Sequence, residues 1–198
     1  MTVREIDTPH GPARAHVDAA ADARGALVLG HGANGSFQAK DLVTAAQVAR
    51  EHDLTVVLVE QPYLVAGRKS AAPAPQLDAA WTAVIEGLEL GDAPLIAGGR
   101  SAGARVACRT AEATGAAGIL CLAFPLHPPG KPEKTRLPEL EAVTQPVLIV
   151  QGKRDPFGMP PAAPSREVVQ VPGTHSLASG LGPLADALRD WLPRVLVS

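Results

Sequence analysis

Short apolar runs alternate with amphipathic stretches along most of the chain. Runs that are continuously apolar or rich in β-branched residues predict strands at residues 25–29, 55–60, 94–98, 118–123, 146–151 and 167–171. The stretches between and after these runs predict helices at residues 41–52, 77–90, 102–113, 137–143 and 181–191. Two further β-type segments, 3–8 and 13–18, flank the turn signal His10-Gly11-Pro12, which predicts an antiparallel hairpin at the start of the sheet.

The apolar runs show what kind of sheet the strands build. Their side chains are apolar throughout instead of alternating with polar ones, which indicates burial on both faces and therefore a parallel sheet covered by helices. We predict a doubly wound α/β fold whose mostly parallel sheet has about seven to eight strands, including the N-terminal hairpin. The chain forms a single domain over residues 1–198, and no stretch is long enough for a separate cap domain.

The pentapeptide Gly99-Arg100-Ser101-Ala102-Gly103 lies between a predicted strand and a predicted helix. A serine on such a sharp turn needs glycine on both sides, because a Cβ there would collide with the neighbouring strand and helix. The turn presents the serine Oγ at the top of the sheet, so we interpret Ser101 as a nucleophile. The alternative is a small residue that the tight turn requires.

Two later strand ends supply partners for this serine. Asp155 follows the strand at 146–151 and His175 follows the strand at 167–171, which gives the order nucleophile, acid, base along the chain. We therefore predict a catalytic triad of Ser101, Asp155 and His175. The alternatives are a turn residue before proline for Asp155 and a surface loop histidine for His175.

The first parallel strand ends in the glycine-rich turn GHGANG at residues 30–35. Its backbone can approach a substrate oxygen closely, so we predict an oxyanion hole there. One donor is the N–H of Ala33 or Asn34, and the other is the N–H of Ala102, which follows the nucleophile. We expect His31 in the same turn to hydrogen-bond the loop backbone.

Loops that follow other strands hold candidates for substrate contact. Tyr63 and Arg68 come after the second parallel strand, and Arg68 is a candidate for binding an acidic group of the substrate. His127 comes after the fourth parallel strand. The alternatives are a salt bridge or loop hydrogen bond for Arg68 and a structural loop role for His127. For Arg100 and Arg105 we predict salt bridges or loop hydrogen bonds instead of substrate contact.

Composition and charge narrow the function classes. The 198 residues are 46% hydrophobic and have a formal net charge of −2 without runs of like charge, which argues against nucleic-acid or membrane partners. The charged N-terminus lacks a signal-peptide pattern, so we expect a soluble cytoplasmic protein acting on a small molecule. Cys108 and Cys121 are predicted to be packed thiols. No residues have metal-ligand spacing, so we propose neither a metal nor a cofactor.

Several segments resemble a known superfamily: LGHGANG at 29–35, QPY and AGR at 61–68, GGRSAGAR at 98–105, FPLHP at 124–128 and GKRDPF at 152–157. On these motifs the chain resembles the α/β-hydrolase superfamily over nearly its whole length. It is most similar to a small capless group related to the dienelactone hydrolases and to the family of testis-expressed protein 30 and non-specific lethal complex subunit 3. The resemblance implies the same triad but no particular substrate. Ser101 stands where the dienelactone hydrolases use cysteine, which argues for an ordinary esterase mechanism.

These observations predict a serine hydrolase that cleaves small carboxylic esters or thioesters through an acyl-enzyme on Ser101. A rival interpretation is a non-catalytic interaction module that keeps the turn only as architecture. A peptidase or an acyltransferase would use the same triad, and no residue selects either activity.

Overall fold

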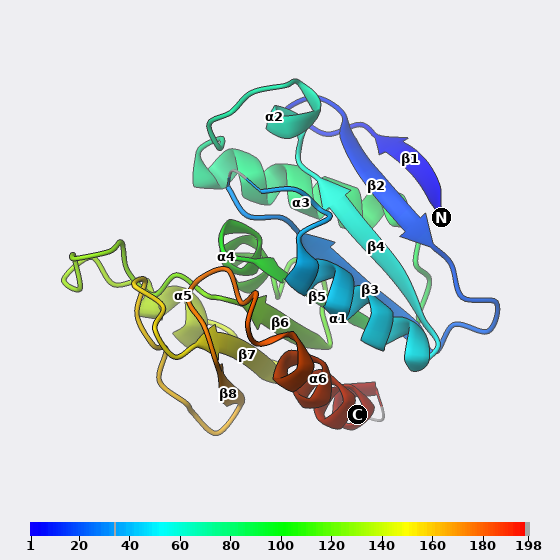
Figure 1. Cartoon of the computed structure of the whole chain (residues 1–198). Coiled ribbons are helices and arrows are strands. Elements are labelled where there is room, and N and C mark those ends of the chain that lie inside the picture. Colours follow the sequence, from blue (N-terminus) through cyan, green and yellow to red (C-terminus); the bar gives the residue numbers. More distant parts are fainter. Residues whose placement is uncertain (34, 197–198) are drawn as a thin grey trace.

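The computed structural model describes residues 1–33 and 35–196, and its centre is an eight-stranded sheet (Figure 1). The spatial order of the strands is β1-β2-β4-β3-β5-β6-β7-β8. β1 pairs antiparallel with β2, β2 pairs antiparallel with β4, and the remaining neighbours are parallel. This arrangement confirms the predicted α/β sheet with an N-terminal hairpin. The strands are β1 (Thr2–Ile6), β2 (Ala13–Asp18), β3 (Gly25–Gly30), β4 (Leu54–Glu60), β5 (Leu95–Arg100), β6 (Gly118–Leu122), β7 (Val147–Gly152) and β8 (Arg166–Val171).

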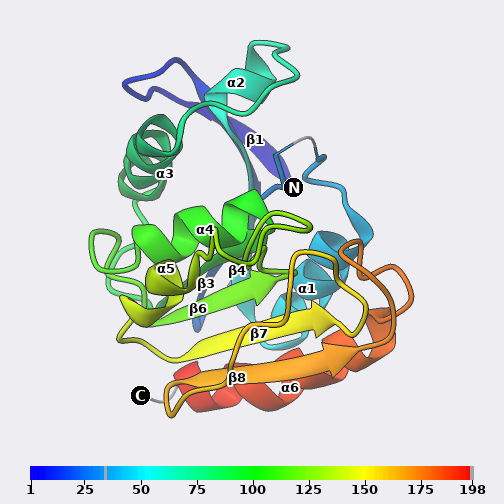
Figure 2. The same ribbon diagram turned by 90° about the vertical axis from the view of Figure 1, so that its left-hand side faces the viewer.

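Helices cover both faces of the sheet (Figure 2). One face packs against α1 and α6, and the other packs against α3, α4 and α5. The short helix α2 lies beside the hairpin at the rim of the sheet. The helices are α1 (Lys40–Glu51), α2 (Pro62–Val65), α3 (Ala74–Leu88), α4 (Ala102–Arg109), α5 (Leu137–Glu141) and α6 (Leu181–Leu196).

The apolar strands build a core on each side of the sheet. Along β3, Val28 packs into the cluster under α3 and α4, whereas Leu27 and Leu29 pack into the cluster under α1 and α6. All three side chains are completely buried. A strand buried on both faces has no polar positions to place toward water, which is why its sequence does not alternate.

The structure differs from the predicted elements mainly at helix ends. Helix α3 begins at Ala74, three residues before the predicted start, because Pro75 fits the first turn of a helix. Helix α6 continues past Trp191 to Leu196 although it contains Pro193. The segment around Tyr63, which reads as a proline-rich loop, contains the single-turn helix α2. A proline at its first position and a length of four residues hide this helix from any periodicity argument.

Two smaller expectations concern the helices and the thiols. Among the described residues, no helix is long and apolar enough to cross a membrane. Cys108 and Cys121 are buried and not disulfide-bonded, and their Sγ atoms lie 3.5 Å apart. They are therefore packed thiols, as predicted.

Candidate active site

The turn between β5 and α4 holds Ser101 in a strained backbone conformation. Its φ of 52° lies in the left-handed region, which residues with a Cβ rarely adopt. The flanking glycines make the turn possible: a Cβ added at Gly99 or Gly103 would lie 2.4 or 2.5 Å from the carbonyl oxygen of Gly30. Both positions therefore need glycine because the end of β3 passes directly beside the turn.

His175 and Asp155 reach Ser101 from the loops after β8 and β7. Ser101 Oγ lies 2.9 Å from His175 Nε2, and His175 Nδ1 lies 2.8 Å from Asp155 Oδ2. The Asp155 side chain is fully buried, and that of His175 is 18% exposed. The three residues that the sequence selected thus form one continuous hydrogen-bonded chain from a partly exposed hydroxyl to a buried carboxylate.

The carboxylate of Asp155 has two further partners. Oδ1 accepts the N–H of Phe157 at 2.9 Å, and Oδ2 accepts a hydrogen from Gln151 Nε2 at 2.8 Å. Gln151 is itself completely buried on β7. The ring of Phe157 packs on the imidazole of His175, with centroids 4.2 Å apart and planes inclined by 33°. These contacts fix the orientation of both Asp155 and His175.

The glycine-rich loop after β3 passes beside Ser101. A Cβ added at Gly32 would lie 3.7 Å from Ser101 Cβ, so the next residue, Ala33, is close to the site. Ala102 is the first residue of α4, and its N–H therefore has no acceptor within the helix. The third predicted donor, Asn34, lies outside the described residues.

His31 and Tyr63 hold this loop in place through hydrogen bonds. His31 Nδ1 donates to the carbonyl oxygen of Gly32 at 2.7 Å, and His31 Nε2 accepts the N–H of Gln61 at 3.1 Å. Burial lowers the pKa of His31, which favours the neutral ring that these two bonds require. Tyr63 Oη donates to the carbonyl oxygen of Ala33 at 2.7 Å. The expected role of His31 as a loop hydrogen-bonding residue is confirmed.

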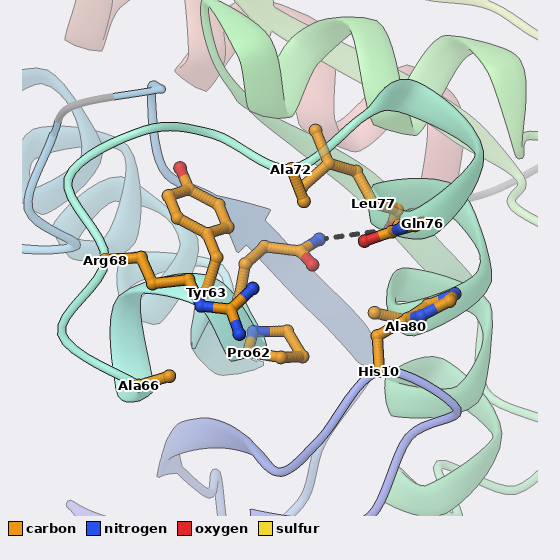
Figure 3. Close-up of a pocket in the computed structure, with 10 residues that line it drawn as sticks. His10, Pro62, Tyr63, Ala66, Arg68, Ala72, Gln76, Leu77 and Ala80 are labelled. Carbon is orange, nitrogen blue, oxygen red and sulfur yellow. Dashed lines mark hydrogen bonds between the residues drawn. The ribbon is translucent and has the colours of Figure 1, made fainter.

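Tyr63 and Arg68 also line a pocket between the hairpin, α2 and α3 (Figure 3). The pocket encloses about 360 Å³, part of it open to solvent. In Figure 3 the Arg68 side chain extends from the loop after α2 toward the middle of the pocket, and His10 lies across from it. A smaller cavity of about 250 Å³ shares Tyr63 with this pocket and reaches Ala102 and Gly103. The two spaces therefore adjoin each other, and Ser101, Asp155 and His175 are not among the residues that line them.

His127 lies elsewhere and takes part in loop structure. The ring Nδ1 is 2.9 Å from the carbonyl oxygen of Pro128, and the backbone N–H of His127 donates to the carbonyl oxygen of Phe157. His127 is not among the residues that line the pocket of Tyr63 and Arg68. The structure therefore separates His127 from the other two candidates for substrate contact and places it against the loop that holds Asp155.

The arginines near the turn form ion pairs, as predicted. Arg105 makes a two-pronged contact with Glu139, at 2.8 and 2.5 Å. Arg100 Nε donates to Asp41 Oδ2 at 2.9 Å. Neither side chain is free to bind a substrate. In the described part of the chain, no group of three or more histidine, cysteine, aspartate or glutamate side chains could hold a metal ion.

A family profile described as "Alpha/beta hydrolase domain" matches residues 23–180. The chain belongs to this alpha/beta hydrolase family. The matched segment begins before β3 and ends after the loop of His175, so it includes Ser101, Asp155 and His175 of the hydrolase. No curated protein matches the sequence.

Solved structures with similar folds extend over the whole hydrolase. A lidless alpha/beta serine hydrolase from Xanthomonas campestris is 22% identical, with a TM-score of 0.78 and coverage of 100% of this chain and 95% of that one. Est1E from Butyrivibrio proteoclasticus is 15% identical, with a TM-score of 0.79 and full coverage of both chains. A dienelactone hydrolase from Anabaena variabilis is 14% identical, with a TM-score of 0.76 and coverage of 98% and 96%. These similarities show the fold, and the Xanthomonas campestris hydrolase is described as having no lid.

Some residues of the hydrolase's site were not found by sequence reasoning. Gln151 reads as an ordinary strand position, and only the folded chain shows that its amide meets Asp155. Phe157 belongs to a motif quoted above, but nothing in its spacing indicates that its ring packs against His175. The one available signal for Gln151 is a polar side chain at the end of an otherwise apolar run, where a buried polar group needs a partner.

Proposed function

We propose that this alpha/beta hydrolase is a serine hydrolase that cleaves small carboxylic esters or thioesters through an acyl-enzyme on Ser101. The observation that carries the proposal is the hydrogen-bonded chain from Ser101 Oγ through His175 to Asp155. A hydroxyl whose proton points at a ring nitrogen can become a nucleophile when a carbonyl carbon approaches. The buried carboxylate on the other side of the ring favours the imidazolium that forms.

The reaction proceeds in two steps with the same groups. Ser101 Oγ attacks the carbonyl carbon, His175 Nε2 takes the hydroxyl proton, and the carbonyl electrons move onto the oxygen. When the tetrahedral intermediate collapses, the bond to the leaving group breaks and His175 gives its proton to the departing alkoxide or thiolate. Water then repeats the attack on the acyl-enzyme with His175 as base, which releases the acid and restores Ser101.

The negative oxygen of the intermediate requires fixed donors. The N–H of Ala102 and the N–H of Ala33 or Asn34 are the proposed pair, as expected from the sequence. Support comes from the N–H at the start of α4, which has no acceptor within the helix, and from the position of Gly32, where an added Cβ would lie 3.7 Å from Ser101 Cβ. Removing one such donor in a serine hydrolase typically slows the reaction by about a hundredfold or more.

The pocket of Tyr63 and Arg68 is the proposed place for the rest of the substrate. Arg68 is an exposed cation, and neither this pocket nor the smaller cavity beside Ala102 is lined by an aspartate or glutamate. Such a lining suits an ester that has an acidic group. Est1E, which has a similar fold, has been solved with ferulic acid bound, so ferulate esters belong in the substrate screen. A cytoplasmic location stays a prediction.

Labelling with a fluorophosphonate probe tests the nucleophile directly. The experiment compares wild type with Ser101→Ala and His175→Ala by intact mass. Ser165→Ala is the matched control, because this exposed serine precedes β8 at the opposite edge of the sheet. We expect one adduct on wild type and on the control, and none on the two site variants.

The result also decides between the enzyme and the interaction module. A single adduct that depends on Ser101 and His175 leads to an ester and thioester screen. A folded wild type without any adduct would contradict the proposed activity and favour the non-catalytic module suggested by the resemblance to the testis-expressed protein 30 family. Retained labelling of Ser101→Ala would show that another residue reacts with the probe.

A further inference from the structure

Arg100 directly precedes Ser101, and its side chain reaches both helix α1 and the loop of His175. Nε donates to Asp41 Oδ2 at 2.9 Å, and Nη2 donates to the backbone carbonyl oxygen of His175 at 3.1 Å. The Arg100 side chain is 19% exposed. One guanidinium therefore links the first turn of α1 with the loop that holds the proposed base.

The same guanidinium also meets the proposed oxyanion loop. A Cβ added at Gly32 would lie 3.0 Å from Arg100 Nη1 and 3.8 Å from the Arg100 carbonyl oxygen. A side chain at position 32 would therefore crowd the guanidinium, which places Gly32 beside Arg100 with little space between them. The loops after β3 and β8 thus share one support, which belongs to the same turn as the nucleophile.

The loop of His175 depends on this support. It follows β8 and is irregular, with Gly173 at φ 115° and Leu177 at φ 54° on either side of the histidine. Within the described residues, no backbone N–H donates to the His175 carbonyl, and Arg100 is its hydrogen-bond donor. A guanidinium holds two acceptors in a fixed plane, so it can fix this carbonyl relative to Asp41.

Asp41 holds Arg100 in place. Its side chain is 1% exposed, and Oδ1 accepts the N–H of Leu42 at 2.9 Å. Burial raises the pKa of Asp41, and the nearby Arg100 acts in the opposite direction. Two charges of this kind depend on each other, because the loss of one leaves the other buried without a counter-charge.

We propose that Arg100 is a positioning residue that holds the base His175 and the loop of Gly32 at the distances from Ser101 that acyl transfer needs. This inference rests on the proposed function of Ser101. It gives a functional role to Arg100, for which the sequence predicted only a salt bridge or a loop hydrogen bond. Loss of Arg100 loosens both loops without touching the reacting atoms, so it lowers kcat more than it raises KM.

The test compares Arg100→Met, Arg100→Lys and Asp41→Asn with a matched control. Arg105→Met is that control, because the Arg105 side chain also pairs with a partly buried carboxylate, and in the described part of the chain no hydrogen bond joins it to either loop of the site. The readouts are the rate constant of fluorophosphonate labelling, kcat and KM on an ester, and circular dichroism for the fold. Proton NMR follows the His175 Nδ1 proton, which hydrogen bonding to Asp155 shifts downfield.

We expect Arg100→Met to label and turn over about tenfold to a hundredfold more slowly, with KM changed little. Arg100→Lys keeps the charge but reaches one acceptor at a time, so its loss is smaller. Asp41→Asn should also slow labelling and turnover. The double variant of Asp41→Asn and Arg100→Met should lose less rate than the two single effects combined. The His175 proton signal weakens or broadens in Arg100→Met and stays sharp in Arg105→Met.

Equal labelling rates for wild type, Arg100→Met and Arg100→Lys would overturn the proposal, as would equal losses in Arg105→Met. If Arg100→Met does not fold, Arg100→Lys and Asp41→Asn decide by the same criteria. If wild type itself is not labelled, the proposed function fails. The NMR signal then decides alone: an unchanged His175 proton in the Arg100 variants rejects the positioning role, and a broadened one supports it.

Discussion

Tyr63 is the single tyrosine of the chain, so its ionisation can be followed without interference from another phenol. The residue is 5% exposed, and burial raises the pKa of Tyr63 to about 12. An ordinary tyrosine has a pKa of about 10. Ionisation would also remove the hydrogen bond that the hydroxyl donates to the Ala33 carbonyl. We therefore predict that the native protein keeps this phenol protonated well above pH 10.

The size and sign of the effect follow from the two pKa values. At pH 11 a phenol with a pKa of about 12 is about one tenth ionised, whereas one with a pKa of about 10 is about nine tenths ionised. The unfolded chain therefore loses its proton first as the pH rises. Between about pH 10 and 12 the unfolded state binds fewer protons than the native state, so the free energy of unfolding decreases. The loss from Tyr63 reaches roughly 2 to 3 kcal/mol once both states are ionised.

The assay is the tyrosinate absorbance near 295 nm, read directly after a pH jump and compared with the same chain in guanidinium chloride. Circular dichroism on the same samples shows that the fold persists during the reading. Tyr63→Phe is the control for stability: the difference in free energy of unfolding between it and wild type should narrow or change sign above pH 10. A native titration with a midpoint near pH 10 would refute the argument, because it would mean that the ring is accessible to water and that the Ala33 contact is absent.

Further predictions concern the turn, the triad and the thiols. Gly99→Ala places a Cβ against the end of β3 and should destabilise the fold by several kcal/mol in chemical denaturation, whereas Gly182→Ala, with open space on α6, should be neutral or slightly stabilising. Asp155→Asn should keep the fold and reduce kcat by about 10⁴, because the imidazole loses the acceptor that fixes its tautomer; activity near the wild-type level would exclude Asp155 as the acid. The hydrogen bond with Cys108, together with burial, raises the pKa of Cys121, and the Cys108 thiol is itself buried, so neither thiol should react with a thiol reagent at pH 8 until the protein is unfolded.

The fold could be predicted from the sequence because burial on both faces leaves a direct trace in it. Strands β3 and β6 are apolar at every position, β7 is apolar as far as Gln151, and glycine or proline marks most of their ends. The predicted helix ends were less accurate than the predicted strands, because a helix end depends on tertiary contacts that the hydrophobic periodicity of the sequence does not record. Helix α6, for example, continues through Pro193 because Trp191, Leu192 and Val195 all pack into the core.

The residues of the candidate site also fall into those that the sequence could predict and those that it could not. In a parallel sheet the carboxyl ends of the strands meet at one edge, so residues that follow different strands can be expected together without any knowledge of distances. This reasoning selected Ser101, Asp155 and His175, which the structure joins by hydrogen bonds. It could not find Gln151 or the second contact of Arg100, because these depend on where a long side chain ends and not on which strand it follows.

The strained turn shows why stability and chemistry depend on the same contacts in this protein. A φ of 52° at Ser101 costs free energy and persists only if the surroundings exclude the relaxed alternatives. Those surroundings are the Gly30 carbonyl, which leaves no room for a side chain at Gly99 or Gly103, and the hydrogen bond from the Ser101 N–H to Leu122 on β6. Because backbone packing enforces the turn, it is held before any substrate arrives. In the proposed mechanism, the side chains of Arg100 and Asp41 have the remaining task of holding the glycine-rich loop and the histidine loop beside a serine that the sheet has already fixed.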